Sequence, residues 1–316
     1  MRSATTNKAS LPAYIAPMLA KPAAKPFDSS EYMFEVKWDG TRAMTYIDAP
    51  GKIRLLNRRR LDITWRYPEL SFMAEALPTG TVLDGEVVVL DAGGKPDFSA
   101  LQSREQARTA LRVKGLVKML PATYVIFDQL YRRGASIMHK RCVERRRTAA
   151  RTVRTLNSRR VVMSEGVTKS GIEYFRQVES RGLEGVVAKR LDSPYAPGQR
   201  TNAWQKIKRS IDVPCVIIGF EVEGKDDFAA LVLAAQDESG NGDLAYVGKV
   251  GTGFNAELRR RINAELWPHV IDRPVVPCKL KARWVEPRLY CIVRCLERTA
   301  AGQLRAPVFG KLLNAR

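Results

Sequence analysis

The chain has 316 residues, 45% of them hydrophobic, and a formal net charge of +20. This length is sufficient for two domains that each bury a core, and no apolar run approaches the roughly 18 residues of a membrane span. Two histidines and five scattered cysteines disfavour imidazole chemistry, a structural zinc and a disulfide framework. The polar N-terminus lacks the apolar stretch of a secretory signal, so we expect a cytoplasmic protein without a membrane partner.

The positive charge is concentrated in the N-terminal two thirds of the chain. Residues 1–211 hold 38 lysines and arginines against 20 aspartates and glutamates, whereas residues 212–316 hold 15 against 13. This excess predicts a polyanionic partner, because a protein that neutralises several phosphates gains affinity from counterion release. An idle basic surface is the alternative.

The N-terminal two thirds of the chain predict mixed α+β structure. Residues 1–30 contain four spaced prolines and are expected to form an extended lead-in to a domain of residues 31–210. Short β-type runs broken by glycine-containing turns predict strands, largely antiparallel, at 34–37, 42–47, 53–56, 82–90, 124–127, 186–189 and 204–208. Helical patterns occur at 69–75, 98–106 and 141–156.

Residues 211–316 predict a separate, smaller β domain. Residues 211–214 are interpreted as a linker, because the charge balance shifts there and residue 214 is a proline. Strands are expected at 215–221, 229–235, 244–250, 282–285 and 290–296, around one helix at 256–266. Five strands with one inserted helix are typical of a partly open barrel such as an OB-fold.

The segment from Glu35 to Arg42 contains the clearest local feature, a lysine at the end of a strand followed by an Asp-Gly turn. A lysine amine is a poor nucleophile while it is protonated, so Lys37 needs activation by its surroundings to act in catalysis. Alone, the Lys-x-Asp-Gly pattern is a weak signal, because such a lysine is usually a solvated residue at a strand edge before a common turn.

Residues further along the chain complete the requirements of one reaction. Attack of a lysine on an α-phosphate needs cations around the phosphate oxygens, carboxylates that hold a divalent metal, and a flat apolar face for a purine. Candidates for these three tasks are, in turn, Arg42, Arg58, Lys206 and Lys208; Glu86 and Glu184; and Phe127. Each has an ordinary structural alternative, such as a core aromatic or a surface carboxylate.

This ordered series resembles the successive motifs of the covalent nucleotidyltransferases, which include ATP-dependent DNA ligases, RNA ligases and mRNA-capping guanylyltransferases. Residues 17–20, 246–254, 284–287 and 304–309 resemble more narrowly the bacterial ligase D and ligase C group of ATP-dependent DNA ligases. The resemblance spans about residues 14–310. It implies an ATP-grasp-like ligase (nucleotidyltransferase) domain followed by an OB-fold β-barrel.

The resemblance implies a role for each residue of the nucleotide site. Lys37 would carry AMP as a phosphoramide, and Glu35 would select adenine through its exocyclic amine. Phe127 would stack on the adenine, opposite Val186 or Val187.

Metal and phosphate binding follow from the same resemblance. Glu86 and Glu184 would bind Mg²⁺ or Mn²⁺, with Glu86 also near the ribose. Lys206 and Lys208 would hold the α-phosphate of ATP.

Three arginines complete the implied site. Arg42 and Arg58 would contact the ribose and the terminal phosphates or the 5′-phosphate of DNA. Arg305 would orient the departing pyrophosphate, which requires a hinge near residues 209–214. The family more often has Ser or Thr at the position of Asn57, whose amide can also form hydrogen bonds.

A second basic feature lies in residues 132–160, which hold eleven lysines and arginines and one acid. We expect Arg145, Arg146, Arg147 and Arg151 to hold phosphates of duplex DNA, and a solvated helical face is the alternative.

The sequence therefore predicts a monomeric, nucleoid-associated enzyme of DNA repair that uses ATP to seal 5′-phosphate/3′-hydroxyl nicks in duplex DNA through lysyl-AMP and DNA-adenylate. End joining with a Ku-like end-binding protein or a separate polymerase, and excision repair, both stay open. The alternatives are an RNA ligase or capping-type guanylyltransferase, and a non-catalytic nucleic-acid-binding module.

Overall fold

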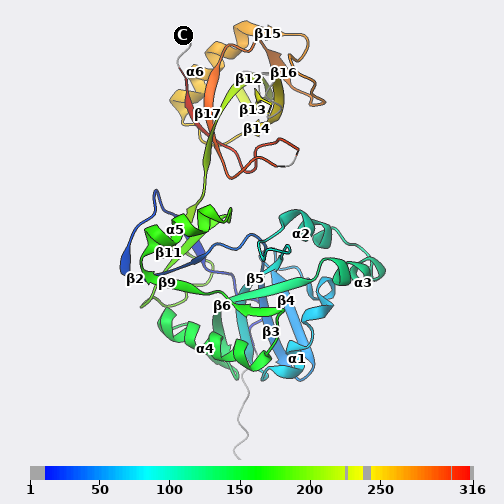
Figure 1. Cartoon of the computed structure of the whole chain (residues 1–316), viewed down its shortest axis with the longest axis vertical. Coiled ribbons are helices and arrows are strands. Elements are labelled where there is room, and N and C mark those ends of the chain that lie inside the picture. Colours follow the sequence, from blue (N-terminus) through cyan, green and yellow to red (C-terminus); the bar gives the residue numbers. More distant parts are fainter. Residues whose placement is uncertain (1–10, 225–226, 238–242, 300, 314–316) are drawn as a thin grey trace, which may run out of the picture. The chain divides into compact units, whose positions relative to one another are not determined.

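The computed structural model describes residues 11–224, 227–237, 243–299 and 301–313. The chain forms two compact units, residues 1–208 and 209–316 (Figure 1). In the part of the chain that the structure describes, no helix is long and apolar enough to cross a membrane.

The first unit contains two sheets. The five-stranded sheet has the order β1-β11-β10-β2-β9, and the six-stranded sheet has the order β4-β3-β5-β6-β7 with β8 beside β6. The pairings are antiparallel except for β1 with β11 and β6 with β8. The strands are β1 Leu19–Pro22, β2 Ser29–Val36, β3 Thr41–Ala49, β4 Lys52–Asn57, β5 Thr81–Val89, β6 Ala122–Arg132, β7 Ala135–Ser136, β8 Val161–Met163, β9 Gly166–Lys169, β10 Gly185–Arg190 and β11 Arg200–Lys208.

Helices cover these sheets from outside. Helix α4 packs on β6 and β8, and α5 packs on β2 and β10 (Figure 1). The helices of this unit are α1 Met73–Ala76, α2 Phe98–Glu105, α3 Ala110–Met119, α4 Cys142–Leu156, α5 Gly171–Ser180, and the 3-10 turns η1 Thr64–Arg66 and η2 Pro68–Leu70. Helix α2 begins where the Asp97 side chain accepts a hydrogen bond from the backbone of Ala100, an ordinary N-terminal cap.

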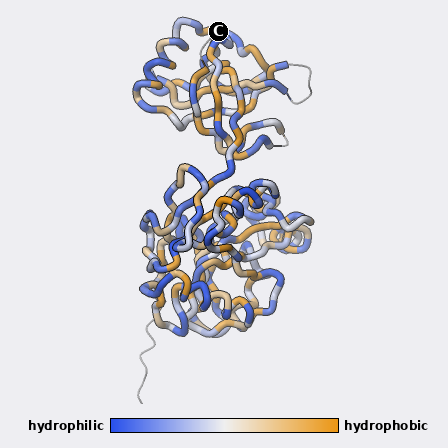
Figure 2. The backbone as a smooth tube through the Cα atoms, turned by 60° about the vertical axis from the view of Figure 1, so that its left-hand side comes forward, coloured by the Kyte–Doolittle hydropathy of each residue, from blue (hydrophilic) through white to orange (hydrophobic). Residues whose placement is uncertain are grey.

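The six-stranded sheet is buried on both faces. Ala43 and Leu83 belong to a hydrophobic cluster on one face, and their neighbours Met44 and Val82 belong to another. In Figure 2 the hydrophobic segments of the tube accordingly follow the strands inside each unit. Strand β5 is central, and Glu86 is its one residue that is not fully buried.

Residues 11–30, expected as an extended lead-in, contribute to this unit. Strand β1 pairs with β11, and Ile15 and Met18 are buried in the same cluster as Phe127 and Trp204. The segment therefore forms part of the wall around the centre of the unit.

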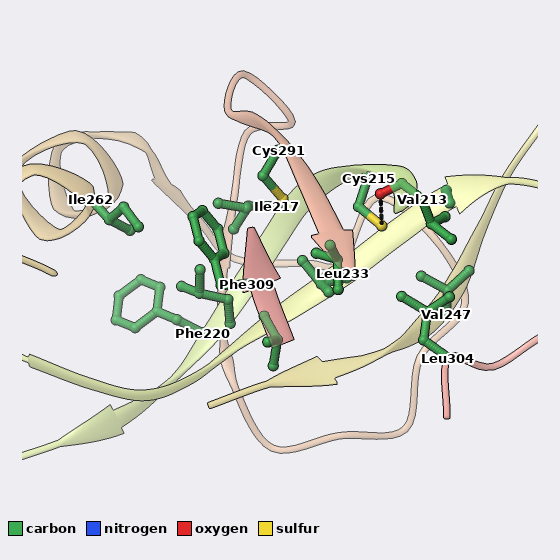
Figure 3. Close-up of a cluster of buried hydrophobic side chains, with 14 of the residues drawn as sticks. Val213, Cys215, Ile217, Phe220, Leu233, Val247, Ile262, Cys291, Leu304 and Phe309 are labelled. Carbon is green, nitrogen blue, oxygen red and sulfur yellow. Dashed lines mark hydrogen bonds between the residues drawn. The ribbon is translucent and has the colours of Figure 1, made fainter. Parts of the chain in front are cut away.

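The second unit is a seven-stranded sheet with one α-helix. Its strand order is β14-β13-β12-β16-β15, and β17 joins β12 to β18. The elements are β12 Ile211–Glu223, β13 Asp227–Gln236, β14 Leu244–Val250, α6 Ala256–Leu266, η3 Trp267–His269, β15 Val270–Ile271, β16 Arg283–Val285, β17 Tyr290–Cys295 and β18 Val308–Leu312. Figure 3 shows its core, in which Phe220, Ile262 and Phe309 from a strand, the helix and the last strand meet.

Two sequence predictions for the fold are wrong. The helix predicted at 69–75 is two short pieces, η2 and α1. Residues 211–214, predicted as a linker, form the start of β12, where Pro214 is tolerated because β12 pairs only with β17 before the ladder to β13 begins at Val216. The predicted hinge stays a prediction and is confined to Arg209 and Ser210, which lie between β11 and β12.

Part of the predicted DNA-contacting arginine cluster is also wrong. The Arg145 side chain is fully buried: its Nε and Nη2 donate to Asp128 at 3.0 and 2.8 Å, and Nη1 donates to the carbonyls of Lys140 and Ser193. It lies on the inner face of α4 and has no surface to offer to DNA. Arg147 and Arg151 are exposed on α4, so their DNA contact stays a prediction.

We expect Arg145→Leu to destabilise the first unit by about 3–5 kcal/mol, because the Asp128 carboxylate would be left buried without a counter-charge. The measurement is urea unfolding followed by tryptophan fluorescence. Arg147→Leu, at an exposed position two residues further along α4, is the control and should change the free energy of unfolding by less than about 0.5 kcal/mol. Equal effects of the two substitutions would contradict a structural role for Arg145.

Candidate active site

A cavity of about 240 Å³ is lined by strands of both sheets in the first unit. Strands β2, β10 and β11 contribute from one sheet, and β3, β5 and β6 from the other. The predicted site residues that line it are Glu35, Lys37, Arg42, Arg58, Glu86, Phe127, Val187 and Lys206.

Strand register explains why three of these residues share the cavity. Val187 on β10 is paired with Glu35 on β2 and with Lys206 on β11, so the three side chains lie side by side on one face. Val186 points to the opposite face and is buried in a cluster with Phe34. The alternation along β10 therefore decides between the two valines in favour of Val187.

Lys37 follows β2 and is anchored by its backbone N–H, which donates to the carbonyl of Gly185 at 2.8 Å. Its ammonium contacts one carboxylate oxygen of Glu184, and the other oxygen accepts from Lys208 Nζ at 2.9 Å. Burial alone would raise the pKa of Glu184, but the two ammonium groups outweigh it and hold that pKa below its usual range. Glu184 is thus a carboxylate that binds cations at neutral pH.

Gly40 explains the Asp-Gly part of the lysine motif. A Cβ at this position would lie 2.3 Å from the carbonyl oxygen of Val87 and 2.8 Å from Cγ of Glu86. Only glycine allows β5 to pass this close to the turn after Lys37. The turn thereby brings the Glu86 carboxylate into the same cavity as the Lys37 amine.

Glu86 is paired in register with Arg42 across β5 and β3. Burial raises the pKa of Glu86 to about 7, and the charges of Arg42 and Lys37 oppose that rise. Arg42 does not neutralise Glu86 directly, because its guanidinium donates to both oxygens of Asp84, at 2.6 Å each.

Glu86 and Glu184 form a pair of oxygen donors that fits a Mg²⁺ or Mn²⁺ ion. Within the described ranges, no three His, Cys, Asp or Glu side chains come together as a complete metal cluster. Mg²⁺ commonly uses one or two carboxylates together with substrate phosphates. This donor set therefore suits a divalent ion that arrives with a nucleotide.

Glu35 is a buried carboxylate of the site with two cationic partners. One of its carboxylate oxygens accepts from Arg146 Nη1 at 2.5 Å, and the other contacts the Lys189 ammonium. Arg146 also donates to the carbonyls of Phe127 at 3.1 Å and Ser164 at 2.6 Å. Because Arg146 is buried in these contacts, its predicted DNA contact is wrong.

Lys189 is a lining residue that the sequence interpretation missed. It lies two residues after Val187 on β10 and therefore points into the same cavity, which is the signal that could have found it. Its ammonium lies 4.1 Å from the ring centre of Phe127 and 4.3 Å from that of Trp204. Burial lowers the pKa of Lys189, and Glu35 opposes the shift.

Cations also gather where phosphates would bind. Burial lowers the pKa of Lys206, and the charges of Lys208, Arg200 and Lys37 lower it further. This mutual repulsion would be relieved by an anion in the cavity.

Arg58 and Arg305 lie outside the strands that line the cavity. Arg58 is exposed in a turn after β4, and the side-chain oxygen of Asn57 accepts backbone hydrogen bonds from Arg59 and Leu61 at 2.9 and 3.0 Å in that turn. Arg305 lies in the second unit and donates to Glu297 at 3.0 Å. Its part in catalysis stays a prediction.

Comparison with protein families identifies the chain. Residues 17–208 match the model of the ATP dependent DNA ligase domain, and residues 224–314 match that of the ATP dependent DNA ligase C terminal region. The chain belongs to the ATP-dependent DNA ligase family. The first match contains every cavity residue predicted from the sequence.

Individual relatives agree with this family. The chain is 33% identical over 300 residues to the multifunctional non-homologous end joining DNA repair protein LigD of Mycobacterium tuberculosis, covering 92% of this chain and 37% of that protein. It is 34% identical over 259 residues to DNA ligase C1 of Mycolicibacterium smegmatis, covering 80% of this chain and 73% of that protein. The chain thus spans little more than a third of the LigD relative.

A solved structure gives the same result for the fold. Mycobacterial DNA ligase D complexed with ATP and MES superposes with a TM-score of 0.56 and 31% identity, covering 96% of both chains. The predicted resemblance to the ligase D and ligase C group and the predicted α+β domain followed by an OB-fold are confirmed.

Glu86 makes the stability of the metal-free first unit depend on pH. Its pKa of about 7 in the folded chain lies above the unfolded value of 4.5, so its protonation favours the folded state at low pH, and that contribution is lost as pH rises through 7. Between about pH 4.5 and pH 8 the loss should be on the order of 2–3 kcal/mol.

The measurement is urea unfolding at both pH values with a chelator present, for the wild type and for Glu86→Gln. The difference between the two proteins isolates this carboxyl from all other titrating groups. Parallel pH profiles would contradict the raised pKa of Glu86.

Proposed function

We propose that the chain is an ATP-dependent DNA ligase that seals nicks bearing a 5′-phosphate and a 3′-hydroxyl in duplex DNA. The observation that carries the proposal is the cavity itself, in which the Lys37 amine lies with the Glu86 carboxylate and the half-buried Lys206. Family membership supports the same reaction class.

The reaction proceeds in three group transfers on this proposal. The deprotonated Lys37 Nζ attacks the α-phosphorus of ATP, a P–N bond forms, and the bond to pyrophosphate breaks. The 5′-phosphate oxygen of the nick then attacks the same phosphorus, which forms DNA-adenylate and releases Lys37. Finally the 3′-hydroxyl attacks the 5′-phosphorus, the phosphodiester forms, and AMP leaves.

Residues of the cavity and their ion-pair partners have separate tasks in this scheme. Lys206 and Lys208 stabilise charge on the α-phosphate oxygens, as fixed cations in a partly dry cavity do effectively. A divalent ion held by Glu86 and Glu184 would add charge neutralisation at the phosphates. Phe127 and Val187 provide apolar surfaces on two sides of the cavity for the base.

Arg42, Arg58 and Arg305 would act on the outer phosphates. Arg42 and Arg58 line the cavity and would contact the ribose and either the terminal phosphates of ATP or the DNA 5′-phosphate. Arg305 would orient the pyrophosphate during the first step through movement at Arg209 and Ser210.

End joining is the repair pathway that the relatives favour. The Mycobacterium tuberculosis LigD protein carries non-homologous end joining in its name, and the chain matches little more than a third of it. On this proposal a Ku-like end-binding protein or a separate polymerase would work with this chain on nicked duplex DNA near the nucleoid, and the chain would act as a monomer.

The decisive test of the first step is a change in mass. Wild-type protein incubated with ATP and Mg²⁺ or Mn²⁺ should gain one AMP, because Lys37 is the nucleophile, and Lys37→Ala should gain none in intact-mass spectrometry. Lys114→Ala, which removes an exposed lysine on α3, is the control and should react like the wild type. Loss of reaction in both variants, or in neither, would sink the proposal.

Substrate range separates the ligase from its alternatives. Nicks with DNA or RNA on each side, each tested with ATP and with GTP, should show sealing of DNA nicks with ATP. Preference for RNA ends would favour an RNA ligase, loading of GMP would favour a capping-type enzyme, and binding of DNA without any lysyl-AMP would favour a non-catalytic module.

Arg146 should act as a positioning residue for base selection. Its contacts hold the Glu35 carboxylate in one orientation, so Arg146→Met should lower the preference for ATP over GTP in self-adenylation by about tenfold, on the order of one lost hydrogen bond to a charged group. Arg146→Lys keeps one donor and should recover part of the preference. If Arg146→Met slowed self-adenylation but left the ratio of the rates with ATP and GTP unchanged, Arg146 would have a purely structural role.

A further inference from the structure

A second cavity, of about 390 Å³, adjoins the nucleotide cavity and shares Arg42 and Arg58 with it. Its other charged lining residues are Arg59, Arg66 and Glu105. Four guanidinium groups therefore face one carboxylate. Arg59 and Arg66 have no part in the catalytic scheme above.

The positive charge of this cavity is only partly neutralised. The Arg42 guanidinium donates two hydrogen bonds to Asp84 and a third to the carbonyl of Met18, and Arg66 Nη1 lies 3.5 Å from Glu105. Arg58 and Arg59 are exposed, and neither guanidinium has a hydrogen bond or an ion pair to any residue that the structure describes. Two full positive charges are thus available to a ligand.

The turn that carries Arg58 and Arg59 is held in one conformation. The backbone N–H of Asn57 donates to Leu61 at 3.0 Å, and that of Arg60 donates to Asn57 at 2.9 Å, in addition to the bonds of the Asn57 side chain. Arg60 has a φ of +64°, a left-handed conformation that costs a residue with a Cβ about 1–2 kcal/mol. Its guanidinium lies 5.1 Å from the ring centre of Tyr14.

An ordered turn of this kind presents its cations in advance of binding. Little conformational entropy remains to be lost by the backbone when a ligand arrives. A strained turn of three consecutive arginines is more easily understood as a binding element than as a solvated loop.

Arg66 contributes a further guanidinium to the lining of this cavity. It belongs to η1, and its guanidinium lies 5.1 Å from the ring centre of Trp65. Its Nε is buried and has no hydrogen-bond partner among the described residues. A buried donor without an acceptor is costly, so this guanidinium is incompletely satisfied, and charge-assisted hydrogen bonds from it to an anionic oxygen would be favourable.

We propose that this second cavity binds the phosphodiester backbone of the DNA strand whose terminal 5′-phosphate enters the nucleotide cavity. Because Arg42 and Arg58 line both cavities, a strand that ends at the nucleotide site continues past Arg59 and Arg66. Guanidinium groups bind phosphate oxygens well and carry no base preference, as a ligase that acts at any sequence requires. This inference rests on the proposed function for the identity of the strand.

The terminal phosphates of ATP are the other source of the same chemistry. The test therefore measures DNA binding and nucleotide loading separately. Binding of nicked duplex with a 3′-dideoxy end is titrated by fluorescence anisotropy without ATP at several salt concentrations. Loading is measured as the rate of self-adenylation against ATP concentration.

The test variants are Arg59→Ala and the double variant Arg59→Ala/Arg66→Gln. The double variant should weaken nick binding about tenfold and flatten the plot of log affinity against log salt by about two phosphate contacts, while the KM for ATP changes much less. Arg59→Ala alone, at a fully exposed position that folding does not require, should show about half of the change in slope. Arg176→Ala, an exposed arginine on α5, is the matched control and should leave the slope unchanged.

Two results would overturn the inference. An unchanged affinity and slope in both variants would show that the cavity does not touch DNA. A large rise in the KM for ATP with unchanged DNA binding would assign the cavity to the terminal phosphates of the nucleotide. Failure of the wild type to form lysyl-AMP would refute the proposed function alone, because DNA binding is measured without ATP.

Discussion

One buried guanidinium, that of Arg146, connects the parts from which the candidate active site is built. It reaches Glu35 on β2, the carbonyl of Phe127 on β6 and the carbonyl of Ser164 after β8. These three acceptors belong to both sheets of the first unit and to the segment between them. A planar group with several fixed donors can satisfy all of them at once, which a lysine cannot. This contact therefore ties the two sheets together beside the nucleotide cavity.

Most of the fold was predictable because its strands and its last helix have strong local signals. The strand at Leu244–Val250 and the helix at Ala256–Leu266 have the predicted bounds. Helix α3 was missed because it buries only Val113 and exposes Leu111 and Met119, so it has little helical periodicity. Helix α5 buries Phe175 and Val178 at the helical spacing of three, a signal that was present in the sequence and was not used.

Site residues were predictable where they belong to a distinctive motif. The prediction failed where burial in the folded chain decides the role of a residue. Lys37 and Glu86 lie in one cavity as their motifs indicate. Arg145, Arg146 and Arg147 are consecutive residues of the same type in one basic stretch of α4. Arg145 and Arg146 are nevertheless buried, whereas Arg147 is exposed. No rule of composition separates them, because the acceptors Asp128 and Glu35 lie far away in the sequence and become neighbours only in the folded chain.

The pairing of β1 with β11 has a consequence for how the chain is made. Leu19 lies beside Arg200, and β2 lies beside β10, so β1 and β2 are made before partner strands that emerge about 150 to 180 residues later. Contacts between such distant segments form slowly, and the edges of the early strands stay unpaired until their partners have been made. The nucleotide cavity, which β1, β2 and β11 surround together, can close only after synthesis of the whole first unit. A nascent chain that stops before β11 would therefore contain Lys37 but not the complete cavity in which its amine is expected to react.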